Sequence, residues 1–104
     1  MANMMKVKAR VLNGMTVVKL TVAHGMEDGQ RKDKATGKRV AAKFLREIRV
    51  MHVGNTVFAA NLSASIAKNP FFAFSFSGGT EGDGLTIDWV ENTGKSGSEI
   101  AKIG

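Results

Sequence analysis

The feature that most constrains the fold of this chain is a period-two alternation of apolar and polar side chains in short segments. In the first segment, Val7, Ala9 and Val11 alternate with lysine and arginine residues. Successive side chains of a β-strand point to opposite faces, so this pattern predicts a strand with one buried and one solvated face. Seven segments are interpreted as strands: Met5–Leu12, Met15–Ala23, Lys43–Val53, Thr56–Leu62, Phe71–Ser77, Gly84–Glu91 and Ser98–Ile103.

Turn signals separate these segments. Asn13-Gly14 is a strong two-residue hairpin signal, and Gly54-Asn55 marks another tight turn. A helix over Ala41–Glu47 is an alternative, but the β-branched residues that follow favour a strand. The chain has 104 residues, which suits one domain. We therefore predict one all-β sandwich domain over residues 1–104, with these inward side chains buried: Val18, Leu20, Phe74, Phe76, Ile87 and Trp89.

The residue types present exclude several kinds of chemistry. Cysteine is absent from the sequence, which rules out a thiolate nucleophile, a redox pair and a cysteine-ligated metal in it. The two histidines, His24 and His52, have no serine in a nucleophile-elbow context. His24 and Met26 are possible soft metal ligands, but two ligands do not make a site. We therefore expect no catalytic residue, metal or cofactor, and a protein that works by binding.

Positive charge is concentrated in one polar segment. Fifteen Lys and Arg against nine Asp and Glu give a net charge of +6. His24–Val40 lacks periodicity and is interpreted as a long loop, which is uncommon unless it has a function. Its cations are Arg31, Lys32, Lys34, Lys38 and Arg39, offset nearby only by Asp33. The run is either a solvated loop or a surface for an anionic partner.

Binding of nucleic acid or another polyanion is the alternative function. The basic charge is compatible with it, but base stacking requires exposed aromatic side chains. Most of the aromatic residues fall on inward positions of the predicted strands. Phe71 breaks that register and is expected to be exposed, so nucleic acid is the less favoured partner.

Several short motifs, in order along nearly the whole chain, resemble the SoxZ family of bacterial sulfur-oxidation proteins. They are the loop 24–33 with signature residues His24, Met26, Glu27, Gly29, Arg31 and Asp33, the basic segment 6–10, and the stretches 42–45, 68–71, 82–83 and 89–92. Three positions depart from the family pattern: Gly25 replaces a usual Pro, Asp28 replaces Thr, and Lys43 stands where His is common. A role for that His cannot be carried over to this chain.

The resemblance implies an immunoglobulin-like sandwich and a non-catalytic role. SoxZ-like proteins pair with SoxY, whose C-terminal arm carries sulfur intermediates on a Cys while other enzymes process them. The partnership acts in the periplasm, and the partner bears the export signal. We find no signal peptide or membrane-spanning run in this sequence, so co-export would explain a periplasmic location.

Two surfaces are candidates for the contacts that this role requires. Met51 and Val53, on the outward face of the third predicted strand, and Phe71 are candidates for binding the SoxY-like subunit. Arg31, Lys32, Lys38 and Arg39 are candidates for a basic docking loop, because charge is depleted from interface centres and suits a steering surface.

Overall fold

A computed structural model describes residues 5–63, 65–66 and 68–104, and it confirms the all-β prediction. Seven strands follow one another along the chain: β1 Met5–Leu12, β2 Met15–Val22, β3 Leu45–His52, β4 Asn55–Asn61, β5 Phe71–Ser77, β6 Gly84–Glu91 and β7 Ser96–Lys102. The helix considered over Ala41–Glu47 does not form, since β3 begins at Leu45. No helix in the described part of the chain has the length and apolar character needed to cross a membrane.

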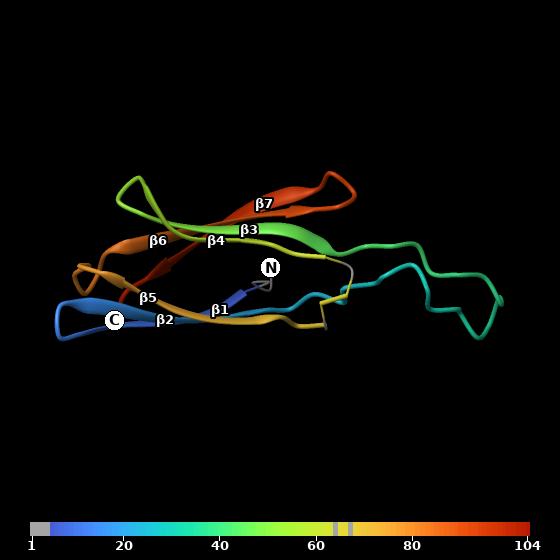
Figure 1. Cartoon of the computed structure of the whole chain (residues 1–104), viewed down its shortest axis with the longest axis horizontal. Helices are drawn as coiled ribbons and strands as arrows, with labels where there is room; N and C mark the ends of the chain where they lie inside the picture. The colour runs from blue at the N-terminus through green and yellow to red at the C-terminus, as the bar shows by residue number, and fades with distance from the viewer. Residues whose placement is uncertain (1–4, 64, 67) are drawn as a thin grey trace.

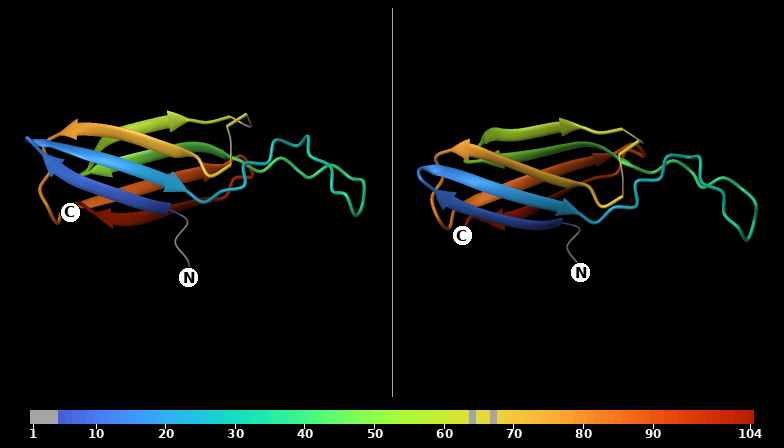
Figure 2. Two further views of the ribbon diagram at one scale, coloured as in Figure 1. Left: turned by 90° about the horizontal axis from the view of Figure 1, so that it is seen from below. Right: turned by 60° about the horizontal axis from the view of Figure 1, so that its bottom comes forward.

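The strands form two antiparallel sheets packed face to face (Figure 1). The three-stranded sheet has the order β1-β2-β5, and the four-stranded sheet has the order β4-β3-β6-β7. At one side of the sandwich β1 lies beside β7, and the Gly104 N–H donates to the Ala9 carbonyl at 2.8 Å. At the other side the edge strands are β4 and β5 (Figure 2). This is the immunoglobulin-like arrangement that the resemblance to the SoxZ family implied.

The core lies between the sheets, as the alternation predicted, with one correction. Val18, Leu20, Ile87 and Trp89 are buried. Phe74 and Phe76, which were expected to be buried, are only half-buried. The reason is their position on β5, an edge strand whose side chains meet those of the opposite edge strand β4 and stay partly open to solvent. There the Phe58 ring stacks on Phe74 with centroids 4.4 Å apart.

Two hairpins have left-handed turn residues. Asn13 and Gly14 have φ of 53° and 77°, which is the conformation expected of an Asn-Gly hairpin. In the β3–β4 hairpin, Val53 and Gly54 occupy the turn with φ of 49° and 77°, and Asn55 begins β4. The predicted Gly54-Asn55 turn is therefore one residue late. Val53 does not lie on the outward face of the strand; it is in the turn and 75% exposed.

The predicted long loop is a narrow two-stranded ribbon, here called the arm (residues 23–44), that projects from one end of the sandwich (Figure 1). Isolated antiparallel bridges join Glu27 to Lys43 and Lys32 to Arg39. The turn at the tip is closed by the Asp33 carboxylate, which accepts from the Ala35 N–H at 2.8 Å. The arm extends the molecule to 53 Å along its longest axis, against 26 and 20 Å along the others.

Candidate functional site

Motifs that lie far apart in the sequence meet at one place, where the arm leaves the sandwich. We call this place the arm base and define it by His24, Met26, Asn69, Glu91 and Asn92. The first two come from the outgoing side of the arm and Asn69 from the turn before β5, while Glu91 ends β6 and Asn92 directly follows it. They belong to three separate stretches of the SoxZ-like pattern, 24–33, 68–71 and 89–92, so the fold brings these stretches together.

A buried histidine–carboxylate pair is the centre of the arm base. His24 Nε2 lies 2.8 Å from Glu91 Oε2, with side chains only 7% and 4% exposed. His24 Nδ1 accepts the Met26 N–H at 2.9 Å, so this nitrogen carries no proton and Nε2 is the one that donates to Glu91. The hydrogen bond fixes both the tautomer and the orientation of the ring.

Glu91 stays ionised in this setting. Burial raises the pKa of its carboxyl, but hydrogen bonds from His24 and Thr93 and the positive charge of Lys43 outweigh burial and hold that pKa below its usual value. The Thr93 hydroxyl donates to the second carboxylate oxygen at 2.8 Å. Lys43, which stands where the family pattern has His, therefore contributes a charge to the site.

Asn69 ties the outgoing side of the arm to the sandwich. The Asn69 N–H donates to the His24 carbonyl at 2.8 Å, and its side-chain oxygen accepts the His24 N–H at 3.1 Å. Asn69 has a φ of 53°, a left-handed conformation that Asn tolerates better than most residues. This reciprocal pair explains why an Asn stands before Pro70.

Asn92 and Met26 hold the returning side of the arm. The Asn92 side chain accepts the Phe44 N–H at 2.8 Å and donates to the Ala42 carbonyl at 3.1 Å. Its backbone N–H donates to the Phe44 carbonyl at 3.0 Å. The Met26 sulfur accepts the buried Leu45 N–H at 3.3 Å, so Met26 is a core residue rather than a metal ligand here.

The remaining signature residues build the arm itself. Glu27 pairs with Arg31, whose Nη2 lies 2.8 Å from Glu27 Oε1. The hydrogen bond and charge of Glu27 raise the pKa of the Arg31 guanidinium. Gly29 has a φ of 83°, and a Cβ there would meet the Ala42 Cβ at 3.4 Å. These signature residues therefore stabilise the conformation of the arm.

The second histidine forms a similar pair at the other end of the sandwich. His52 Nε2 lies 2.8 Å from Asp83 Oδ2, with side chains 15% and 34% exposed. The His52 ring also lies against Phe76, with centroids 5.1 Å apart. The hydrogen bond from His52, followed by one from the Thr80 backbone, lowers the pKa of Asp83. Both histidines are therefore committed to structural hydrogen bonds.

The contacts of the arm base position the arm relative to the sandwich. Within the part of the chain that the structure describes, no three His, Cys, Asp or Glu side chains come together as a metal site. At the arm base, His24 is hydrogen-bonded to Glu91, the Asn69 and Asn92 side chains bond to the backbone of the arm, and the Met26 sulfur accepts a backbone N–H. What the arm base does physically is fix the direction in which the arm leaves the sandwich.

The basic residues predicted as a docking loop lie on the outer half of the arm. Arg31, Lys32, Lys38 and Arg39 are all exposed. The Lys32–Arg39 bridge places two cations opposite each other. Because the arm is held at its base, these charges stand away from the sandwich body.

The apolar residues predicted to bind a partner are not brought together. Met51 lies on β3 on the outer face of the four-stranded sheet, and Val53 lies at the far hairpin. Phe71 begins β5 in the other sheet, opposite Thr21, and is 59% exposed. One flat interface cannot hold all three, and their partner-binding role stays a prediction.

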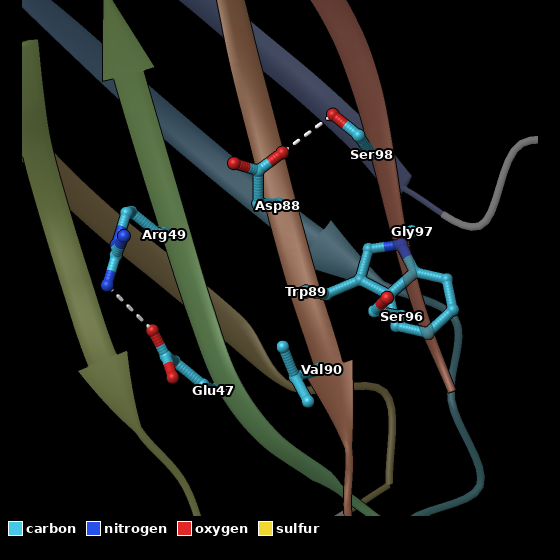
Figure 3. A pocket seen from close by; sticks show the side chains of 8 residues that line it. All are labelled: Glu47, Arg49, Asp88, Trp89, Val90, Ser96, Gly97 and Ser98. Atoms are coloured by element: carbon cyan, nitrogen blue, oxygen red, sulfur yellow. Dashed lines mark hydrogen bonds and ion pairs between the residues drawn. The ribbon is translucent and has the colours of Figure 1, made fainter. Parts of the chain in front are cut away.

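The outer face of the four-stranded sheet has a shallow pocket of about 500 Å³ (Figure 3). Its charges are satisfied locally: Arg49 pairs with Glu47 at 3.0 Å, and the Ser98 hydroxyl donates to Asp88 at 2.6 Å. Gly97 lies directly opposite Trp89, and a Cβ there would come within 2.5 Å of the indole. Sequence reasoning did not identify this pocket, because its residues come from three strands.

Comparisons with known proteins give one family and one fold. The family model described as sulphur oxidation protein SoxZ matches residues 4–102. No curated protein sequence matches the chain. Among solved structures, the chain is similar to a superoxide reductase (neelaredoxin) from Ignicoccus hospitalis, with a TM-score of 0.62 and 14% identity over 97% of this chain and 79% of that chain. At this identity the likeness concerns the fold alone.

Proposed function

The chain belongs to the SoxZ family of sulphur oxidation proteins, and from this premise we propose that it is the non-catalytic subunit of a thiosulfate-oxidation carrier complex. In this role it pairs with a SoxY-like subunit, whose C-terminal Cys carries the covalent sulfur intermediates. The chain's own task is to stabilise the carrier and to present surfaces to the enzymes that process its cargo.

The absence of cysteine from the sequence is the observation that supports this division of labour. Covalent attachment of sulfur requires a thiolate, and this chain has none. Both histidines are held in hydrogen bonds to carboxylates, so neither is poised as the base of a nucleophilic site. The chemistry therefore belongs to the partner.

The arm is the element that this proposal assigns to enzyme docking. It carries exposed cations on a ribbon whose base is fixed by the His24–Glu91 pair and by Asn92. Charged residues on such a projecting element steer association more than they add affinity. We place the working complex in the periplasm, reached by co-export with the signal-bearing partner.

Co-expression with a SoxY-like subunit tests the proposal. The two chains should purify as a heterodimer, and after incubation with thiosulfate and the oxidising enzymes the intact mass of this chain should be unchanged. The mass increase should appear on the cysteine-bearing partner, and a Cys→Ser variant of that partner should show none. A stoichiometric adduct on this chain, or no heterodimer at all, would contradict the proposal.

A further inference from the structure

The outer face of the three-stranded sheet carries positive charge without any negative charge. Its outward positions on β1 and β2 include the exposed cations Lys6, Lys8, Arg10 and Lys19. The outward positions of β5 are Phe71, Ala73, Ser75 and Ser77. Figure 2 shows this face formed by β1, β2 and β5, with the arm projecting beyond one end of it. We call it the basic face.

The basic face has a charge arrangement that costs stability. Lys8 lies directly opposite Lys19 in the β1–β2 register, and like charges placed opposite each other destabilise a sheet. None of the four cations belongs to any ion pair found among the described residues. On the outer face of the other sheet, Arg49 has a carboxylate partner. Within the part of the chain that the structure describes, these four charges therefore form no ion pair that stabilises the fold.

Apolar side chains flank these cations. Lys8, Arg10 and Lys19, together with Leu12 and Val17, line a hollow of about 410 Å³. Leu12 pairs with Met15 at one end of the face, and both are exposed, as is Phe71 at the other end. A surface that combines exposed apolar anchors with unpaired cations fits a protein partner of opposite charge.

A protein fits these observations better than a nucleic acid does. Nucleic acid binding without sequence preference uses aromatic platforms interleaved with cations. Here the cations surround aliphatic residues, and the aromatic side chain of the face, Phe71, lies at one end opposite Thr21. Lysine is depleted at the centre of stable interfaces, which favours a transient contact over a permanent one.

We propose that the basic face is a second docking surface, separate from the arm, for an acidic patch on a protein that acts on the carrier complex. The partner would present carboxylates to Lys8, Arg10 and Lys19 and a small apolar group to the hollow between them. This inference rests on the proposed function, because it takes the partner to be an enzyme that processes carrier-bound sulfur.

Charge reversal on the basic face tests the inference. The double variant Lys8→Glu/Lys19→Glu in the carrier heterodimer should raise the KM of at least one processing enzyme for the carrier by about ten-fold at low ionic strength, with kcat unchanged. The difference should shrink at high salt. The matched control is Lys95→Glu/Lys102→Glu, which changes the net charge equally at exposed positions near β7, and its KM should stay close to that of the wild type.

A second variant separates docking from folding. Lys19→Glu alone creates an opposite-charge pair with Lys8 and should raise the urea midpoint of unfolding while it still raises the KM. The inference fails if both variants give the same KM as the control for every enzyme. It also fails if an oligonucleotide binds the wild type, but not Lys8→Glu/Lys19→Glu, at physiological ionic strength. If the wild-type heterodimer does not form, the proposed function itself fails and this inference falls with it.

Discussion

Two histidine–carboxylate pairs lie at opposite ends of the sandwich and differ in how deeply they are buried. In both, Nε2 lies 2.8 Å from the carboxylate oxygen. The His24–Glu91 pair is almost fully buried, whereas Asp83 of the second pair is 34% exposed. The same contact therefore stands in two environments within one small domain.

The difference in burial reflects the different contacts that stabilise the two ends of the molecule. The outer half of the arm is exposed, and its base is fixed by the buried His24–Glu91 pair together with the hydrogen bonds of the exposed Asn69 and Asn92. The other end has aromatic packing, with the His52 ring against Phe76, and its hydrogen bond supplements that contact. Removing one member of a buried network leaves a desolvated group without a partner, which costs more than losing an exposed pair.

The largest expected effect concerns the core that both pairs adjoin. Trp89 precedes Glu91 by two residues on β6 and is buried against Gly97. Trp89→Ala should lower the free energy of unfolding by about 3–5 kcal/mol, the usual loss when a large aromatic site is emptied. Urea unfolding followed by circular dichroism measures it, and a loss under 1 kcal/mol would contradict the core assignment.

The second-largest loss of stability is expected when the buried His24–Glu91 pair is broken. His24→Ala leaves the Glu91 carboxylate buried with only the Thr93 hydroxyl as a side-chain donor, and we expect a loss of about 2–4 kcal/mol in unfolding free energy. Hydrogen exchange should also quicken at the Glu27 and Lys43 amides, which pair across the arm. Unchanged exchange at these amides would show that the pair does not hold the arm.

The exposed pair should matter less. His52→Ala should give a smaller loss of stability than His24→Ala, because solvent can replace the hydrogen bond to Asp83. Faster exchange should be confined to the β5–β6 turn, where the Thr80 N–H bonds to Asp83, and the arm amides should be unaffected. If the two variants lost equal stability, burial would not be the deciding difference.

The smallest expected effect is the dependence of the protein's stability on acidic pH. The folded-state pKa of Glu91 is below its ordinary value of 4.5. Its contribution is therefore fully present above pH 4.5 and is lost as the pH falls through the folded pKa. Wild-type stability should decline more steeply below pH 4.5 than that of Glu91→Gln. Urea midpoints from pH 3 to 5 measure this, and equal slopes of the two profiles below pH 4.5 would contradict the assignment.

The strands were predictable because alternation is a local signal. The predicted and observed bounds of β1, β5 and β6 coincide, and Asn13-Gly14 forms the expected turn. The burial of Phe74 and Phe76 was overestimated because alternation identifies the inward face but not whether a strand lies at an edge. The sequence also could not place Val53 in the turn, since valine rarely adopts a positive φ.

The site was predictable only as a set of separate motifs. His24 and Glu91 are 67 residues apart, and no periodicity links them. The family resemblance covered all five residues of the arm base, within the stretches 24–33, 68–71 and 89–92, without indicating that they meet. The basic face was missed for a related reason: Lys19 belongs to a different strand from Lys8, and only the β1–β2 register makes them neighbours.

Val53 offers a practical route to more demanding experiments. A β-branched residue in a left-handed turn is strained by about 1 kcal/mol, and asparagine suits that position far better. Val53→Asn should therefore give a more robust parent protein without touching the arm base or the basic face. In that background, variants as damaging as Trp89→Ala are more readily purified in folded form and compared under the same conditions.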